Sequence, residues 1–290
     1  MFSAQDVKAL REKTGAGMMD CKKALQESNG NMDDAITWLR EKGISKAAKK
    51  ESRIAAEGLA KSLIKGNKAV ILEVNSETDF VAKNENFQNF VNELAEIIID
   101  SNAKTMDEAL NLEKDGEKIS DKVIAITSKI GEKISFRRFE VVEKTDSQNF
   151  GTYSHMGGKI VVLTVLEGAH EEVAKEVAMH AAAMRPQYLN ESEVPEDVLN
   201  KEKEIMKEQL LNEGKPAERI DQIMIGKVKK FYEEVCLENQ IFIKAENKET
   251  VGKYIANNGG KLVNMIRYEV GEGMEKRNEN FAEEVANQMK

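Results

Sequence analysis

The residue types that most often carry out enzyme chemistry do not form a known catalytic pattern in this sequence. Its three histidines are His155, His170 and His180, and none belongs to an HExxH zinc motif or to a carboxylate cluster with metal-binding spacing. There is no GxxxxGK[ST] or GxGxxG phosphate loop and no GxSxG nucleophile motif. Residues 157–159 (Gly-Gly-Lys) lead into a strand-like segment, which favours a hairpin turn over a nucleotide loop. We therefore expect no catalytic residues, no metal site and no cofactor.

One short segment, residues 78–82 (TDFVA), looks like neither core nor ordinary turn. Thr78 is placed to cap a one-turn helix, and Asp79 would lie in its first turn, where the helix dipole favours a negative charge. Phe80 and Val81 are adjacent on that helix, so they cannot both point inward. Two interpretations follow for Phe80. It is a core anchor, as large apolar side chains usually are, or it is an exposed aromatic on a rigid turn, which is typical of an interface hot spot.

The composition favours a protein or a small molecule as partner. The 290 residues include 43 basic and 51 acidic side chains, a net charge of −8, which argues against a primary role in binding nucleic acid. Cys21 and Cys236 lie far apart without CxxC spacing, so they predict neither a disulfide framework nor a zinc site. The first residues do not resemble a signal peptide, and the apolar runs are too short to span a membrane. We expect a cytoplasmic protein.

The elements around these residues predict an α+β fold. Residues 1–43 form three short helices, the first capped by Ser3 with Asp6 in the reciprocal position and the third ending at Gly43. Residues 45–61 form a helical connector. The apolar positions of the three helices are Val7, Leu10, Met18, Cys21, Ala24, Leu25, Met32, Ala35, Ile36 and Leu39.

The middle of the chain alternates strands and helices. Strands are expected at residues 68–74, 134–142 and 159–166, and helices at 87–99 and 171–184. The segments 66–98 and 157–184 share one plan, a glycine turn, an apolar strand, a turn and a helix, which indicates two related α/β halves. Two charged helices follow in residues 196–234, broken at 214–216, and form a protruding antiparallel pair. Further strands are expected at 240–244 and 266–270, and a final helix carries Phe281, Val285 and Met289.

Two segments resemble the signatures of the elongation factor Ts family. They are residues 14–25 (TGAGMMDCKKAL) and 73–82 (EVNSETDFVA). The resemblance continues in order through residues 129–132 (KIGE), 153–155 (YSH), 179–180 (MH) and 270–273 (VGEG), so that it covers essentially the whole chain. Two long motifs in the family's order make the match specific.

This resemblance implies an architecture and a partner. Residues 1–54 would be a ubiquitin-associated-like (UBA-like) bundle, 55–140 and 141–185 with 232–265 the two halves of the core, 186–231 a coiled-coil arm, and 266–290 a C-terminal helical module. The partner would be elongation factor Tu, in its GDP-bound and nucleotide-free forms, and the activity guanine-nucleotide exchange. No membrane and no direct nucleic-acid contact are implied. A homodimer formed through the arm stays an open alternative.

The resemblance also implies roles for single residues. Asp79 and Phe80, flanked by Thr78 and Val81, would enter the partner near its Mg²⁺ site and displace the ion. The other partner-binding residues would be Met18, Lys22, Ile130, Gly131, His155, Phe242 and Ile243.

Each of these residues also has a structural interpretation. Lys22 and His155 could be solvated surface residues, and Ile130 with Gly131 could simply end a helix. One of Met18 and Met19 would be core and the other interface, and His180 would be a packed core histidine.

Two other function classes remain to be separated from exchange. An RNA-associated protein could use a basic stripe formed by Lys46, Lys49, Lys50, Arg53 and Lys61, and its affinity would depend strongly on salt. A small-molecule enzyme would need pairs of titratable groups that line a pocket.

Overall fold

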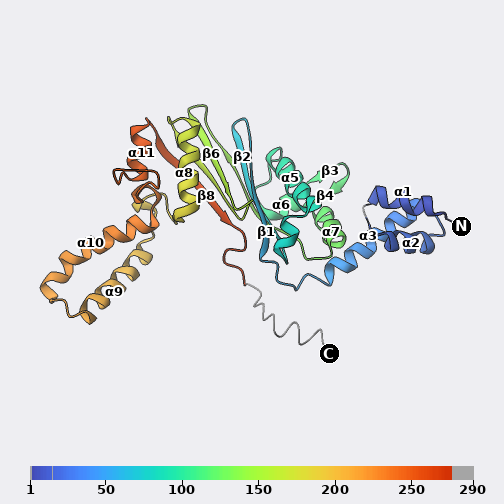
Figure 1. Cartoon of the computed structure of the whole chain (residues 1–290), viewed down its shortest axis with the longest axis horizontal. Helices are drawn as coiled ribbons and strands as arrows, with labels where there is room; N and C mark the ends of the chain where they lie inside the picture. Colours follow the sequence, from blue (N-terminus) through green and yellow to red (C-terminus); the bar gives the residue numbers. More distant parts are fainter. Residues whose placement is uncertain (1, 15, 276–290) are drawn as a thin grey trace. The chain divides into compact units, whose positions relative to one another are not determined.

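The computed structural model describes residues 2–14 and 16–275, which combine helices and strands in the expected α+β class (Figure 1). The described residues divide into two units. The first contains residues up to 63, 72–141 and those from 269 onward, and the second contains 64–71 and 142–268. Within the described part of the chain, no helix is long and apolar enough to cross a membrane.

The N-terminal bundle of the first unit consists of the three expected helices, α1 (Ala4–Thr14), α2 (Met18–Glu27) and α3 (Met32–Ala48). The Ser3 and Asp6 side chains cap each other's backbone N–H at the start of α1, as predicted. Asn31 caps α3 by accepting the N–H groups of Asp33 and Asp34. The bundle core is formed by Leu10, Cys21, Ala24, Leu25 and Ala35, all fully buried.

Two predictions near the end of this bundle are wrong. Helix α3 does not end at Gly43 but continues to Ala48, because Gly43 is buried where α3 packs on α7 (Ile119–Ile130), within van der Waals reach of Ser128. This burial outweighs the roughly 1 kcal/mol that a glycine costs inside a helix. The predicted helical connector at 45–61 is also wrong beyond Ala48, since β1 (Glu57–Lys65) begins in that segment and pairs with β2 (Lys68–Ser76). Tertiary pairing overrides the helix propensity of its alanines and lysines.

The first sheet has the strand order β1-β2-β5, where β5 is Ser135–Glu143. Strand β2 is buried from Ala69 to Ser76, as expected of a strand covered on both faces. Helix α5 (Glu85–Ile99) buries eight residues, including Phe87 and Leu94. The short elements between them are α4 (Asp79–Ala82), α6 (Met106–Leu110), β3 (Glu113–Lys114) and β4 (Glu117–Lys118).

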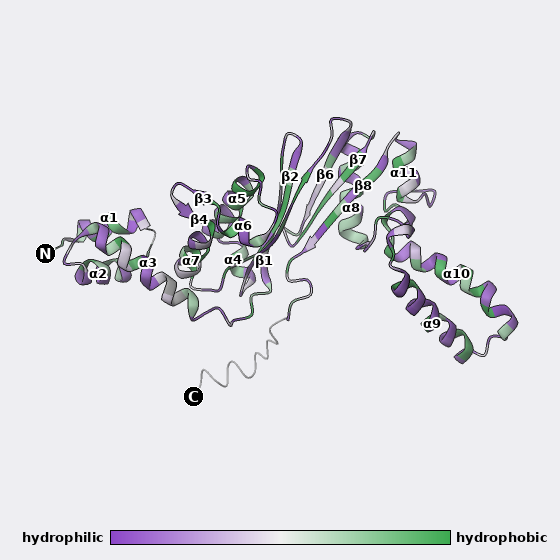
Figure 2. Ribbon diagram, turned by 180° about the vertical axis from the view of Figure 1, so that it is seen from behind, coloured by the Kyte–Doolittle hydropathy of each residue, from purple (hydrophilic) through white to green (hydrophobic). Residues whose placement is uncertain are grey.

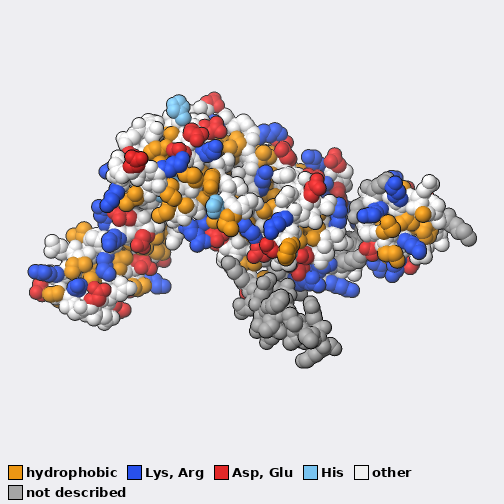
Figure 3. All heavy atoms as spheres, in the orientation of Figure 1, with side chains coloured by type: hydrophobic (Ala, Val, Ile, Leu, Met, Phe, Trp, Pro, Cys, Tyr) orange, Lys and Arg blue, Asp and Glu red, His pale blue; other side chains and the backbone are white. Residues whose placement is uncertain are grey.

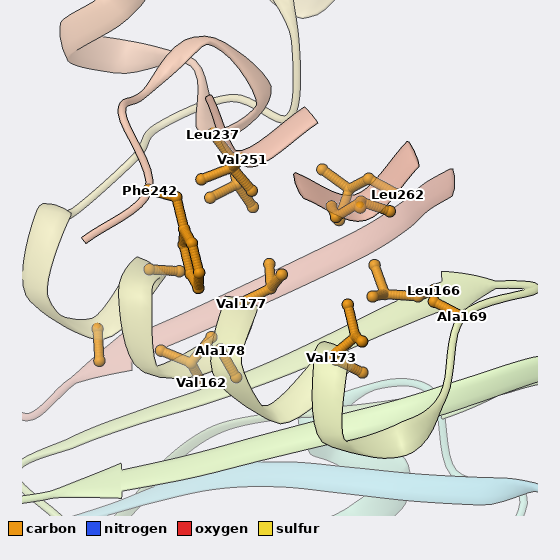
Figure 4. Packing of buried hydrophobic residues seen from close by; sticks show 14 residues of the cluster. Val162, Leu166, Ala169, Val173, Val177, Ala178, Leu237, Phe242, Val251 and Leu262 are labelled. Carbon is orange, nitrogen blue, oxygen red and sulfur yellow. The ribbon is translucent and has the colours of Figure 1, made fainter. Parts of the chain in front are cut away.

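The second unit repeats the plan of strand followed by helix. Its sheet has the order β6-β7-β8, formed by β6 (Gln148–His155), β7 (Ile160–Glu167) and β8 (Lys261–Glu269), and β6 pairs antiparallel with β7. Helix α8 (Glu171–Met184) has the predicted bounds. Its apolar face packs with α11 (Val251–Asn257) and with the short 3₁₀ helix η2 (Leu237–Asn239) around Val177 and Phe242 (Figure 4). Another 3₁₀ helix, η1, spans Glu191–Glu193.

The strand predicted at residues 240–244 is wrong. Only Ile241 makes a bridge, to Thr250, and the rest of the segment is irregular. The ring of Phe242 enters the core cluster, and the N–H of Ile243 is taken by a side chain, that of His180, at 3.1 Å. A side chain therefore replaces the strand neighbour that regular pairing would need.

The two charged helices are α9 (Glu196–Asn212) and α10 (Ala217–Val235), and the residues that join them, 213–216, include the predicted break at 214–216. They contact each other along their length, and α10 carries more hydrophobic residues than α9 (Figure 2). Leu210 and Ile220, near the turn, and Val235, at the end of α10, are the buried residues of this pair, whereas Ile225 is 74% exposed. The helix predicted at Phe281, Val285 and Met289 lies outside the described residues.

Candidate functional site

Helix α4, which contains residues 79–82 of the motif, has one side exposed to solvent and one side buried in the protein. Val81 and Ala82 are buried, whereas the Phe80 side chain is 77% exposed and Asp79 is exposed beside it. The core-anchor interpretation of Phe80 is therefore wrong, and Phe87, fully buried on α5, fills that role. Val81 and Ala82 occupy the inner side of this single turn, which leaves no room there for the adjacent Phe80.

Lys83 covers the exposed side of α4. Its Nζ lies 3.6 Å from Asp79 Oδ2 and 5.8 Å from the centre of the Phe80 ring. The ion pair is solvent-exposed and therefore weak, and the cation–π contact is of the exposed kind. A partner could displace Lys83 at little free-energy cost, which leaves Asp79 and Phe80 available.

The start of α4 is held by a reciprocal pair of carboxylates that sequence reasoning missed. Thr78 occupies the N-cap position, but its side chain does not cap the helix. Instead its N–H and hydroxyl donate to the two carboxylate oxygens of Glu132, at 2.9 and 2.8 Å. In return, Glu77 Oε1 accepts the backbone N–H of Lys133 at 2.6 Å and the Arg53 guanidinium at 3.2 Å. We call these two exchanges the 77/132 clamp.

The clamp brings Ile130 and Gly131 to the motif. These residues end α7, where Gly131 has φ +88°, a left-handed conformation that glycine adopts without strain. Ile130 is half-buried and Gly131 is exposed, and the next two residues, Glu132 and Lys133, are bonded to the motif. The helix-ending interpretation of Gly131 is confirmed. No local sequence signal predicts the clamp, because its partners lie more than fifty positions apart in the chain.

Replacing Glu132 by alanine tests this clamp. We expect the free energy of unfolding to fall by about 1–3 kcal/mol, because two hydrogen bonds to a charged acceptor are lost and the Thr78 N–H is left without its partner. The amide of Thr78 should also exchange with solvent faster. Urea unfolding and hydrogen exchange measure the two effects, and Glu96→Ala, an exposed site on α5, is the control. An unchanged Thr78 exchange rate would contradict the bracing role.

The bundle presents a second set of predicted residues. Met18 is 59% exposed and Met19 is 73% exposed on α2, so the expectation that one of them enters the core is wrong. Cys21, Ala24 and Leu25 fill the core side of α2 instead, and Lys22 is exposed. Two flexible apolar side chains next to a lysine form an adaptable contact surface.

The remaining predicted residues lie in the second unit. His155 is exposed at the end of β6, with its ring stacked 6.1 Å from that of Tyr153. Phe242 is only 3% exposed, whereas Ile243 is 52% exposed, so the two residues differ in what they can offer a partner. His180 is fully buried, and the packed-core interpretation is confirmed. Among the described residues, no group of three or more His, Cys, Asp or Glu side chains could hold a metal ion.

Comparison with known protein families gives a match to the family described as Elongation factor TS. It spans residues 77–272, about two thirds of the 290 residues. The matched region begins at Glu77, the first residue of the clamp, and includes α4 with Phe80 and residues 142–268 of the second unit. The chain belongs to the elongation factor TS family, whose members act on elongation factor Tu as nucleotide exchange factors in translation elongation.

Proposed function

We propose that this protein binds elongation factor Tu·GDP and accelerates GDP release by inserting Asp79 and Phe80 next to the partner's Mg²⁺ site. One observation carries the proposal: Phe80 is 77% exposed on a turn that the 77/132 clamp holds in place. A large apolar side chain on a rigid turn is the build of an interface hot spot. The protein acts through binding energy, not as an enzyme, and GTP then reloads the vacant site.

Exchange follows from thermodynamic coupling. If the protein binds nucleotide-free elongation factor Tu more tightly than the GDP form, it must weaken GDP binding by the same factor. Burial of one phenylalanine is worth about 1.5–3 kcal/mol, so several surfaces have to contribute. Displacing Mg²⁺ adds to this effect, because the ion is the largest local charge on the phosphates.

The other surfaces are assigned by the same reasoning. Residues 1–54 form the UBA-like docking module, with Met18 and Lys22 on its contact face. His155 contacts the partner from the end of β6, and Ile243 does so from the 232–265 part of the core. Phe242, because it is buried, acts by anchoring the segment that carries Ile243. Residues 186–231 form the coiled-coil arm.

The test is the release of a fluorescent GDP analogue from elongation factor Tu, followed with and without the full chain. We expect release to accelerate with protein concentration and to reach a maximum. Excess Mg²⁺ should slow the catalysed release, because it opposes displacement of the ion. Failure of the folded protein to accelerate release at any concentration would overturn the proposal.

RNA binding is the alternative function, and it can be distinguished from exchange by adding RNA to the release assay. Of the predicted basic stripe, Arg53 donates to Glu77, which reduces its availability to phosphate. Basic and acidic side chains are also intermingled on the face in Figure 3. Both observations support a protein partner over a polyanion. RNA that competes with elongation factor Tu at low salt only would favour the alternative.

A further inference from the structure

His180 links two backbone segments through both nitrogens of its ring. It lies on α8 and is fully buried. Its Nδ1 is 3.1 Å from the backbone nitrogen of Ile243, whose N–H can only donate. Nδ1 must therefore be the unprotonated acceptor, and Nε2 carries the proton and donates to Gln240 Oε1 at 3.0 Å. The two bonds define one neutral tautomer of the imidazole.

Gln240 extends this network to the ends of two helices. Its side chain is almost completely buried, and its amide group donates to the carbonyl of Glu234 at 2.8 Å and to that of Met184 at 3.3 Å. Met184 is the last residue of α8, and Glu234 lies in the last turn of α10. Gln240 thereby satisfies carbonyls that helix ends leave without an intrahelical partner. Its own orientation is set by the proton on His180.

The segment between these two fixed points displays two isoleucines. Phe242 points into the core (Figure 4). Its ring stacks on that of Tyr254, with 4.1 Å between the ring centres, and lies 5.8 Å from the ring of His180. Ile241 and Ile243, on either side of it, are 47% and 52% exposed. Outward, inward, outward is the alternation of a β-strand. The bridge of Ile241 to Thr250, with the Phe242 N–H donating to the Glu249 carbonyl at 2.9 Å, holds the first part of the segment by backbone pairing, whereas the Ile243 N–H is held by the His180 side chain.

We propose that His180 is a positioning residue for elongation factor Tu binding. By accepting the N–H of Ile243 and donating to Gln240, it holds Ile241 and Ile243 outward in the conformation that the partner contacts. This inference rests on the proposed function, in which Ile243 meets the partner. His180 itself is buried and does not touch the partner, but the affinity of the surface formed by Ile241 and Ile243 depends on it.

The role requires a neutral ring. Protonation of Nδ1 would replace the acceptor by a donor and would repel the Ile243 N–H. Burial lowers the pKa of His180 below its ordinary value of 6.5, and the bond to Gln240 only partly offsets this effect. The titratable groups nearby are engaged elsewhere, since Glu176 on α8 is bonded to Lys244 and to the Tyr254 hydroxyl. Cys236, before η2, has its pKa raised to about 11 by burial and is neutral.

The pH dependence follows from the same pKa. Because the folded-state pKa of His180 lies below the unfolded value of 6.5, the unfolded chain binds more protons in acid. The stability that the neutral ring contributes is present above pH 6.5 and is lost as the pH falls toward the lower, folded-state pKa. The affinity of the folded protein for elongation factor Tu should decrease only as the pH falls through this lowered, folded-state pKa, where the ring itself takes up a proton, and this decrease should be absent in a variant without the imidazole.

The experiment compares three variants of the full chain. His180→Asn keeps an acceptor near the Nδ1 position, His180→Phe keeps a ring but removes both polar atoms, and Thr164→Val is the matched control. Thr164 is likewise fully buried in the second unit, and its hydroxyl bonds to the carbonyls of Gly151 and Ala174, away from the 240–243 segment. The readouts are the apparent KM for elongation factor Tu·GDP, the maximal release rate and hydrogen exchange at the Ile243 amide.

We expect His180→Phe to raise the apparent KM about tenfold, to leave the maximal rate unchanged and to speed exchange at Ile243. His180→Asn should restore most of the affinity and should remove the acid dependence. Thr164→Val should lose stability without a change in KM. If His180→Phe and Thr164→Val have the same KM, or if the Ile243 amide stays protected in His180→Phe, the positioning role is overturned.

A fourth variant distinguishes failure of the positioning role from failure of the exchange function. Ile243→Asp places a charge on the exposed surface itself and should raise the KM at least as much as His180→Phe. Normal KM in Ile243→Asp would overturn the inference while leaving the exchange activity of the wild type established. Absence of any acceleration by the wild type would instead overturn the proposed function together with the inference.

Discussion

Replacing Phe80 by alanine is expected to lower the maximal rate of GDP release from elongation factor Tu roughly 10- to 100-fold. Burying a phenylalanine side chain is worth about 1.5–3 kcal/mol, and each 1.4 kcal/mol corresponds to about tenfold. The free energy of unfolding should not change, because the ring is 77% exposed in the free protein. Stopped-flow release at saturating protein, together with urea unfolding, measures both quantities.

Two controls test whether the lower rate comes specifically from the loss of the exposed Phe80 ring. Phe87→Ala, seven residues away, removes a fully buried ring and should destabilise the fold by about 3–5 kcal/mol. Ile225→Ala removes an equally exposed apolar side chain from α10 and should leave the maximal rate unchanged. If the Phe80→Ala variant releases GDP at the wild-type rate, Phe80 has no role in exchange and another residue must disturb the Mg²⁺ site.

Replacing Glu73 by glutamine is expected to produce the largest loss of stability from a single charge change. Glu73 is fully buried on β2, and its carboxylate accepts hydrogen bonds from Arg137 at 2.9 Å, Arg138 at 2.6 Å, Asn75 at 3.0 Å and the N–H of Gly271 at 2.8 Å. A glutamine of similar shape would remove the buried counter-charge of both guanidinium groups and leave Arg138 with the partly exposed carboxylate of Glu272, at 3.8 Å. Breaking a buried ion pair costs about 3–5 kcal/mol, and the partial exposure of the two arginines places the expected value near 3 kcal/mol.

The same network fixes the segment that follows β8. Arg138 also donates to the carbonyl of Glu269 at 3.2 Å, and Arg137 donates to that of Glu272. Gly271, at φ +74°, passes so close to Ala56 that a Cβ there would lie 2.1 Å from its carbonyl oxygen. Loss of the Glu73 carboxylate should therefore loosen residues 269–273 first, and hydrogen exchange at the Gly271 amide should show it.

The contribution of Glu73 to stability is lost in acid, as is that of His180, because both groups have a folded-state pKa below the ordinary value. Burial opposes its ionisation, but the Gly271 N–H, Asn75 and Arg138 together outweigh burial and lower the pKa of Glu73 below 4.5. Its contribution to stability is thus present above pH 4.5 and is lost as the pH falls through the lowered pKa. The Glu73→Gln variant should lose this part of the acid transition in urea titrations. Glu143→Gln, on an exposed ion pair with Lys68, should change neither stability nor its pH dependence, and equal behaviour of the two variants would contradict the account.

The sequence by itself determined the elements whose signal is local. Helix α8 was predicted with the bounds that it has, 171–184, because its apolar spacing and the Arg-Pro pair that ends it depend only on neighbours along the chain. The motif at residues 78–82 was found in the same way, since adjacent Phe80 and Val81 cannot share one face of a helical turn. The family resemblance then indicated which of the two would meet a partner.

The tertiary structure decided whatever depends on contacts between distant residues. Residues 57–65 became a strand only through pairing with β2, against their helix propensity. The 77/132 clamp joins residues more than fifty positions apart in the chain, and the bonds of Glu73 reach Gly271. Periodicity cannot reveal such bonds, because a buried N–H or carboxylate acquires its partner only when the packed fold excludes water from it.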